Sequence, residues 1–256
     1  MANLIDYMLN YYGDELIQET PRFVSLIDQL RSKSVVLHPT IRRAADGKDG
    51  GAIDIEDFKI LYLLVRTFKP KVVFEIGTWI GTSAMVIAEA MKKNDNDGKL
   101  YTCDINDYYT LGSRYDDQII RINKMSDEAI TEIPKSEIID FVFADGELTF
   151  ATIKLLRSRI NTQSIIATHD YLMPAEKGVL NLVRMQLKSG FKYNSYSRIN
   201  TTNYHNIDSC IGILLSDTLL NSINLRGQYY GLKLLETIHL GVNATISKIY
   251  KKFSPF

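Results

Sequence analysis

The sequence predicts an α/β protein with a doubly wound, mostly parallel sheet, and its central stretch provides two reasons for this prediction. Residues 72–74 form an unbroken apolar run, which is typical of a strand buried on both faces of a parallel sheet. A glycine turn follows, and apolar residues then recur at helical spacing: Ala84, Met85, Ile87, Ala88 and Met91. Strand, glycine turn and helix in this order make the first unit of a doubly wound fold.

The other elements are placed around that unit. Apolar runs bounded by turn residues predict further strands at residues 99–104, 119–122, 138–144 and 164–168. An antiparallel hairpin, residues 191–199 and 210–215, should complete a seven-stranded sheet whose last strand is antiparallel. Helical periodicity predicts helices in the first forty residues, on both sides of Pro21, and from Asp54 to the stretch before Pro70.

Composition limits the class of protein. A chain of 256 residues with 45% hydrophobic content can bury one substantial core. Lysine plus arginine equals aspartate plus glutamate at 30 each, so no bulk charge attracts nucleic acid. Cys103 and Cys210 lie in apolar runs, which indicates buried free thiols in a reducing compartment. With no secretory signal and no long apolar stretch, we expect a cytoplasmic protein.

Three segments are predicted. Residues 1–51 should be a helical N-terminal extension ending in a glycine-rich loop, residues 47–51, that acts as a lid. Residues 52–216 should form the α/β domain. Residues 217–256 should be an extension with an amphipathic helix from about Tyr229. Its apolar stripe favours packing on the same domain or in a homo-oligomer over a membrane surface.

The glycine turn indicates the kind of ligand. Glu75, Gly77 and Gly81 form the pattern E-x-G-x-x-x-G, which is neither the G-x-G-x-x-G dinucleotide fingerprint nor a phosphate-binding loop. A carboxylate at the end of the strand would repel a phosphate. It suits a cationic ligand instead, such as the sulfonium and amino groups of S-adenosylmethionine.

This turn resembles the first motif of class I S-adenosylmethionine-dependent methyltransferases, in the form typical of small-molecule O-methyltransferases that act on catechols or sugars. The resemblance covers roughly residues 52–216 and implies a Rossmann-like fold. It also implies that the cofactor is held by these residues of the turn: Glu75, Gly77, Thr78, Trp79, Gly81 and Ser83.

Further cofactor contacts are expected behind the turn. Asp104 ends the second predicted strand, where an acidic side chain can accept both ribose hydroxyls of an adenosine. The resemblance places Met125 and Ser126 near the adenine. Ser126 could equally serve as a plain N-cap of the following helix.

Acidic residues also end the fourth and fifth predicted strands, at Asp145 and at the pair His169 and Asp170. The resemblance implies that these three side chains bind a divalent metal such as Mg²⁺ or Mn²⁺, and that Asp145 also contributes to the cofactor site. Two acids at one sheet edge would repel each other without a cation. The alternative is metal-free, with His169 taking the proton while a neighbouring aspartate orients it.

This chain lacks the general base that the resembled family usually carries. Related enzymes carry a lysine or a histidine three residues after the first of these acids, and this chain has Leu148 there. In the loop between the last two strands, His205 and its neighbour Tyr204 are candidates for substrate contact or proton transfer.

The sequence therefore predicts an S-adenosylmethionine-dependent O-methyltransferase that acts on a hydroxyl of a small molecule or sugar. One alternative is an oxidoreductase on the same fold, against which the absent G-x-G-x-x-G pattern argues. The other is a protein that binds the cofactor without transferring the methyl group.

Overall fold

The computed structural model describes residues 4–37, 53, 55–169, 191–195, 211–216 and 218–219. These residues include one seven-stranded sheet with the strand order β3-β2-β1-β4-β5-β7-β6. All strands run parallel except β7, which is antiparallel to β5 and β6. The strands are β1 (Val72–Ile76), β2 (Lys99–Cys103), β3 (Ile119–Ile122), β4 (Phe141–Ala144), β5 (Ile165–Thr168), β6 (Phe191–Ser195) and β7 (Gly212–Ser216). The predicted fold class is confirmed.

The strand order reverses between β1 and β4. From β1 the chain first moves outward to β2 and β3, and it then returns to place β4 on the other side of β1. The loops that leave β1 and β4 therefore part in opposite directions and open a crevice at the carboxyl ends of the strands. Ligands of doubly wound proteins bind at such a switch point.

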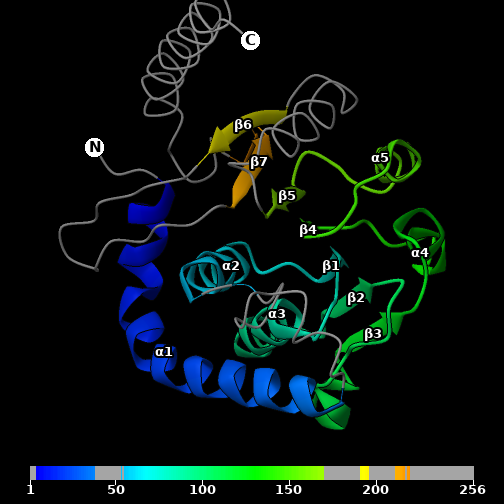
Figure 1. The fold of residues 1–256 in the computed structure, drawn as a ribbon. Helices are drawn as coiled ribbons and strands as arrows, with labels where there is room; N and C mark the ends of the chain where they lie inside the picture. Colours follow the sequence, from blue (N-terminus) through cyan, green and yellow to red (C-terminus); the bar gives the residue numbers. More distant parts are fainter. Residues whose placement is uncertain are drawn as a thin grey trace, which may run out of the picture.

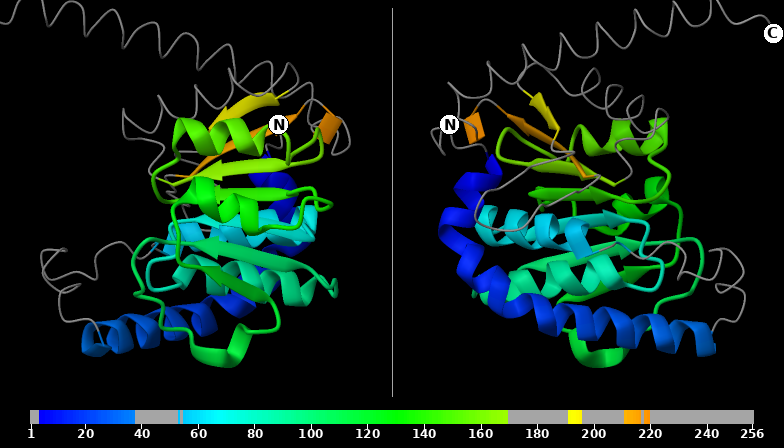
Figure 2. Two further views of the ribbon diagram at one scale, coloured as in Figure 1. Left: turned by 90° about the vertical axis from the view of Figure 1, so that its right-hand side faces the viewer. Right: turned by 60° about the vertical axis from the view of Figure 1, so that its left-hand side comes forward.

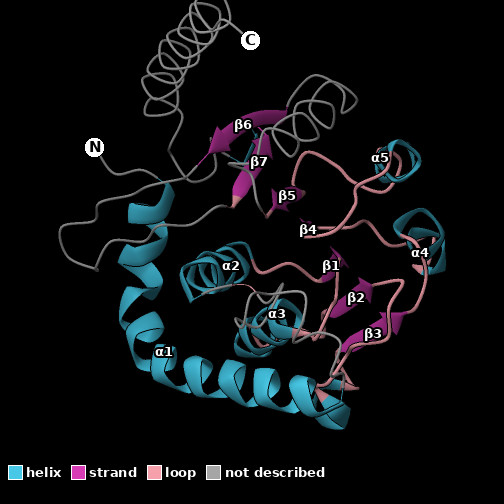
Figure 3. Ribbon diagram, in the orientation of Figure 1, coloured by secondary structure: helices cyan, strands magenta, loops and turns pink. Residues whose placement is uncertain are grey.

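Helices cover both faces of the sheet (Figures 1 and 3). The helices of one face are α1 (Leu4–Leu37), α2 (Ile55–Phe68) and α3 (Thr82–Lys93), and those of the other are α4 (Ser126–Glu132) and α5 (Phe150–Leu156). Each face has its own apolar cluster. Figure 2 shows the two faces in turn, with α4 and α5 toward the viewer in the left view and α1, α2 and α3 toward the viewer in the right view. Among the described residues, no helix is long and apolar enough to cross a membrane.

The N-terminal residues form one helix with Pro21 inside it, where the sequence indicated two apolar faces on either side of the proline. Figure 1 shows α1 as two arms at an angle. Proline lacks the amide hydrogen that would bond four residues back, and its ring pushes that carbonyl away, which bends a helix. The bend lets both predicted faces pack: Ile5 and Met8 of one arm and Phe23 of the other are completely buried.

The fourth strand begins later than predicted, at Phe141 rather than at residue 138. The Asp140 carboxylate accepts hydrogen bonds from the backbone N–H groups of Lys71 and Val72, at 2.8 and 3.0 Å. The Asp140 side chain therefore accepts the hydrogen bonds that a backbone carbonyl would accept in a regular sheet, and the strand begins only after it. The predicted lid at residues 47–51 and the predicted tail helix lie outside the described residues. The segment boundaries, homo-oligomer formation and cytoplasmic location stay predictions.

Candidate active site

The turn after β1 requires a glycine at position 77. Gly77 has a φ of +93°, and a Cβ there would lie 2.8 Å from the carbonyl carbon and oxygen of Asp145 and 2.9 Å from the nitrogen of Gly146. The backbones that leave β1 and β4 thus touch at this point. Only a residue without a side chain permits that approach, which shapes the floor of the crevice.

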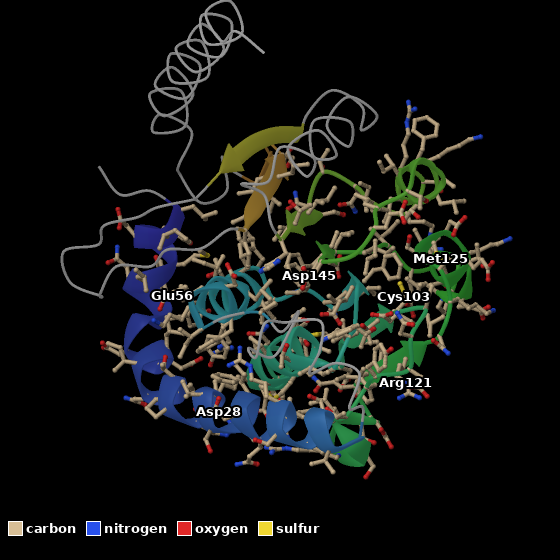
Figure 4. The ribbon with its side chains drawn as sticks, in the orientation of Figure 1. Asp28, Glu56, Cys103, Arg121, Met125 and Asp145 are labelled. Atoms are coloured by element: carbon tan, nitrogen blue, oxygen red, sulfur yellow. The ribbon has the colours of Figure 1, made fainter. Side chains whose placement is uncertain are left out.

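A pocket of about 120 Å³ opens beside this turn. Its wall comes from the ends of β1, β2 and β4 and from the start of α4: Ile76, Gly77, Cys103, Asp104, Ile105, Lys124, Met125, Ser126, Gly146 and Glu147. Figure 4 labels Cys103 and Met125 on this side of the sheet. Four residues that the sequence assigned to a cofactor, Gly77, Asp104, Met125 and Ser126, therefore line one pocket.

Asp104 is fixed by the backbone around it. Its Oδ2 accepts a hydrogen bond from the N–H of Trp79 at 2.8 Å, and its Oδ1 accepts one from the N–H of Asn106 at 2.9 Å. A carboxylate has about four acceptor positions, so two bonds leave capacity for hydroxyl donors. Asp104 therefore faces the pocket as an oriented acceptor.

Glu75 lies beneath the turn and not in the pocket wall, with none of its surface exposed. Its Oε2 accepts a hydrogen bond from the Thr102 hydroxyl, which lies 2.5 Å from the Thr78 hydroxyl. Its Oε1 is buried and makes no hydrogen bond with any described residue. Glu75 would therefore act on a ligand through its field rather than by direct contact.

Burial raises the pKa of Glu75 to about 7. The neighbouring hydroxyls of Ser83 and Thr102 lower this pKa, and the nearby carboxylates of Asp145 and Asp104 raise it further. A carboxyl with this pKa is partly protonated at neutral pH. The same burial raises the pKa of the Cys103 thiol to about 12, which keeps this free thiol protonated and unreactive.

Gly81 and Trp79 complete the turn without lining the pocket beside Gly77. Gly81 begins α3 with a φ of +94°, and a Cβ there would meet the side chains of Leu111 at 3.0 Å and Tyr109 at 3.2 Å. A side chain at position 81 would thus press on these residues rather than on the pocket. The Trp79 ring packs edge-on against Tyr108, with ring centroids 4.8 Å apart.

The structure tests the helix-cap interpretation of Ser126. Met125, not Ser126, is the N-cap of α4, and no side chain caps this helix end. The Ser126 hydroxyl lies 2.7 Å from the Thr152 hydroxyl and donates to the Glu147 carbonyl at 3.3 Å. The helix-cap interpretation is therefore wrong, because Ser126 is already the first residue of α4 and its hydroxyl lies against Thr152 of α5. The position of Ser126 near the adenine stays a prediction.

Asp145 and His169 come together at the carboxyl ends of β4 and β5, as predicted. His169 Nδ1 lies 2.9 Å from Asp145 Oδ1. The other ring nitrogen, Nε2, is hydrogen-bonded to Oδ2 of Asp57 in α2, at 3.0 Å. Sequence reasoning missed Asp57, because an acid in the first turn of a helix looks like an ordinary partner of the helix dipole.

The predicted metal site is described only in part, because its ligand Asp170 lies outside the described residues. Within the described residues, no group of three or more histidine, cysteine, aspartate or glutamate side chains could hold a metal ion. Both nitrogens of His169 face carboxylates, so the ring presents neither to a metal. Asp170, Tyr204 and His205 lie outside the described residues. Leu148 is 8% exposed and belongs to the apolar cluster beneath α4 and α5.

Comparison with known proteins finds similarity to methyltransferases. Residues 74–171 match a family model described as a methyltransferase domain. This match runs from the first glycine turn to the end of β5, so it contains the pocket and the ends of both acidic strands. A comparison with curated protein sequences gives no significant match.

Solved structures share the fold. The O-methyltransferase TomG from Streptomyces achromogenes, in complex with SAM, is 18% identical with a TM-score of 0.53, covering 73% of this chain and 89% of that one. The O-methyltransferase from Bacillus cereus, in complex with SAH, is 14% identical with a TM-score of 0.54, covering 73% and 91%. A putative caffeoyl-CoA O-methyltransferase from Staphylococcus aureus is 17% identical with a TM-score of 0.50, covering 78% and 99%.

Over residues 74–171 the chain is similar to a methyltransferase domain, and it shares its fold with solved O-methyltransferases. The resemblance inferred from the sequence is thus confirmed, since the chain matches a methyltransferase domain over residues 74–171 and has the fold of the O-methyltransferases.

Proposed function

We propose that this protein is an S-adenosylmethionine-dependent O-methyltransferase that acts on a hydroxyl of a small molecule or sugar. The observation that supports this most is the pocket at the switch point, where Gly77, Asp104 and Ser126 meet beside the buried acid Glu75. The relatives in fold include O-methyltransferases that bind SAM or SAH.

Each part of the pocket has a task in this proposal. Asp104 accepts the ribose hydroxyls, Met125 and Ser126 border the adenine, and Gly77 lets the ligand approach the backbone. The negative field of Asp104, to which Glu75 adds when it is ionised, favours a cationic ligand. S-adenosylmethionine, when bound, supplies an electrophilic methyl group. The protein then contributes mainly proximity and a proton acceptor.

We assign the proton acceptor to His169. As the acceptor's O–H bond breaks, its electron pair stays on the oxygen that takes the methyl group, and its proton passes to the pair formed by Asp145 and His169, whose facing atoms are 2.9 Å apart. The imidazolium formed there would lie between Asp145, 2.9 Å from Nδ1, and Asp57, 3.0 Å from Nε2. Two carboxylates stabilise that charge, so a base at position 148 is not needed.

Calorimetric titration tests the cofactor. We expect S-adenosylmethionine to bind and NAD to give no heat, because the chain lacks the dinucleotide fingerprint. Tight NAD binding would favour an oxidoreductase. Product detection on a panel of catechols, glycosides and hydroxy acids then tests methyl transfer. Cofactor binding without product on every acceptor would favour the alternative of a protein that only binds the cofactor.

Replacing Asp104 by alanine should weaken cofactor binding. The lost hydrogen bonds from two hydroxyls to a charged group are worth about 1–3 kcal/mol, which is roughly a 5- to 150-fold rise in Kd. Asp117→Ala removes a carboxylate that is exposed beyond β2 and serves as the control. If calorimetry gives the Asp104→Ala protein the wild-type Kd for S-adenosylmethionine, the ribose does not lie at Asp104.

Methyl transfer should persist in EDTA. Both ring nitrogens of His169 face carboxylates. The protonated ring therefore supplies the positive charge between the two acids that a metal ion would otherwise supply. The measurement is the initial rate on an identified acceptor with and without the chelator. A loss of rate in EDTA that magnesium or manganese restores would overturn the metal-free scheme.

A further inference from the structure

Thr102 is a polar residue in the buried middle of the sheet. It belongs to β2, which lies between β1 and β3 (Figure 1), and none of its surface is exposed. In the register of β1 and β2 it stands directly beside Glu75. A buried hydroxyl destabilises the fold unless it is hydrogen-bonded. The partners of this hydroxyl therefore decide what Thr102 contributes.

The Thr102 hydroxyl joins the buried acid to the glycine turn. It donates a hydrogen bond to Oε2 of Glu75, and its oxygen lies 2.5 Å from the hydroxyl of Thr78, which is also buried. A hydroxyl has one hydrogen to donate, and an ionised carboxylate can only accept. The hydrogen of Thr102 therefore points to Glu75, and the hydrogen of Thr78 points to Thr102.

The hydrogen bond from Thr102 favours the ionised form of Glu75. Burial raises the pKa of this carboxyl to about 7, and the hydroxyls of Ser83 and Thr102 act in the opposite direction. A donor stabilises the charged form of an acid because its dipole points at the negative oxygen. Without the Thr102 hydroxyl, Glu75 would hold its proton up to a higher pH.

The ionisable groups around Glu75 do not favour its charge. They include two acids and two groups whose pKa is raised to about 12 by burial, namely Asp104, Asp145, Cys103 and Tyr109. The two acids repel a further negative charge, and the thiol and the phenol are neutral near pH 7. The hydroxyl donors therefore act against these neighbours as well as against burial.

The charge of Glu75 can distinguish the two forms of the proposed cofactor. S-adenosylmethionine carries a positive sulfonium, and transfer of its methyl group leaves the neutral thioether of S-adenosylhomocysteine. A negative charge beneath the turn attracts the first form more than the second. Such a preference would favour binding of the methyl donor and release of the product.

We propose that Thr102 is a positioning residue of the cofactor site, whose hydroxyl holds the Glu75 carboxylate toward the turn at Thr78 and so favours the cationic methyl donor over its neutral product. The consequence for the cofactor rests on the proposed function. The link between Thr102 and Glu75 rests on the hydrogen bonds alone.

The pH dependence of unfolding tests that link without any ligand. Thr102→Val keeps the shape of the side chain and removes the hydroxyl. A folded-state pKa above the unfolded value gives stability that is lost as the pH rises through the folded pKa. In Thr102→Val we therefore expect the fall in the free energy of unfolding, measured by urea denaturation, to continue to a higher pH than in the wild-type protein.

Two variants separate this effect from the loss of a buried hydroxyl as such. Thr102→Ser restores the donor and should restore the wild-type pH profile. Ser164→Ala removes another completely buried hydroxyl, which donates to the Ile139 carbonyl at 2.7 Å at the other end of the sheet. It should lower stability equally at every pH. If Thr102→Val does so too, the hydroxyl does not act on Glu75 and the proposal is wrong. Thr102→Ala replaces Thr102→Val if that protein does not fold.

Calorimetry at pH 8 tests the consequence for the cofactor. Thr102→Val should raise the Kd of S-adenosylmethionine about 5-fold more than that of S-adenosylhomocysteine, because only the first has the sulfonium charge. Thr102→Ser should keep the wild-type ratio of the two Kd values. Equal changes of both Kd values in Thr102→Val would reduce Thr102 to a structural role.

Glu75→Gln provides a test that needs no change at position 102. It removes the charge directly, so it should lose at least as much of the preference for S-adenosylmethionine as Thr102→Val does. A Glu75→Gln protein with the wild-type ratio would overturn the proposal, since the acid would then not distinguish the two ligands. A wild-type protein that binds neither ligand would instead refute the proposed function, and the pH profiles would still decide whether Thr102 acts on Glu75.

Discussion

Gly77→Ala should lower the free energy of unfolding more than any other single glycine substitution in the described turns. The new Cβ would lie 2.8 Å from the backbone carbonyl of Asp145, and the residue would have to keep a φ of +93°. Neither the clash nor the strain can be relieved by rotating a side chain, because the neighbouring atoms belong to the backbone. We expect a loss of about 3 kcal/mol or more in the free energy of unfolding, measured by urea denaturation.

Two other glycines with positive φ separate the effect of the steric clash from that of the backbone strain. A Cβ at Gly112, with a φ of +70°, would meet only the Lys33 ammonium at 4.0 Å, so Gly112→Ala should cost only the backbone strain of about 1 kcal/mol. Gly81→Ala adds contacts with the side chains of Leu111 and Tyr109, which can move, and should fall between the two. Equal losses for Gly77→Ala and Gly112→Ala would contradict the close approach of β1 and β4.

The buried carboxyl of Glu75 should make stability depend on pH. Its pKa is raised from 4.5 to about 7, so between these values the folded protein holds a proton that the unfolded chain has lost. The stabilisation that Glu75 contributes to the folded state is fully present below pH 4.5, falls as the pH rises, and is lost above about pH 7. The shift corresponds to about 3 kcal/mol of unfolding free energy.

Glu75→Gln removes the titration and keeps the shape of the side chain. Urea denaturation at several values of pH should show a smaller fall in the free energy of unfolding between pH 4.5 and pH 8 than in the wild-type protein. Glu128→Gln changes an exposed carboxyl of α4 and is the control. A Glu75→Gln protein with the full wild-type pH dependence would mean that another group is responsible.

Local sequence was sufficient for the sheet. The apolar runs before Glu75 and before Asp145 predicted buried parallel strands, since a strand covered on both faces admits no polar break. The sequence left the effect of Pro21 open, because a proline can either end or bend a helix. The helix continues past Pro21 with a bend because both of its arms pack on α2 and α3. The late start of β4 was also beyond the sequence, because it depends on Asp140 reaching across to Lys71 and Val72.

The sequence by itself determined the glycine turn and the acidic strand ends, because strand order and spacing bring Gly77, Asp104 and Asp145 to one edge of a doubly wound sheet. Tertiary structure alone decided how the charges there are arranged. It buried Glu75 under the turn and raised its pKa, and it placed Asp57 of α2 against His169. Burial and pairing depend on neighbours from distant parts of the chain, and no local pattern encodes those.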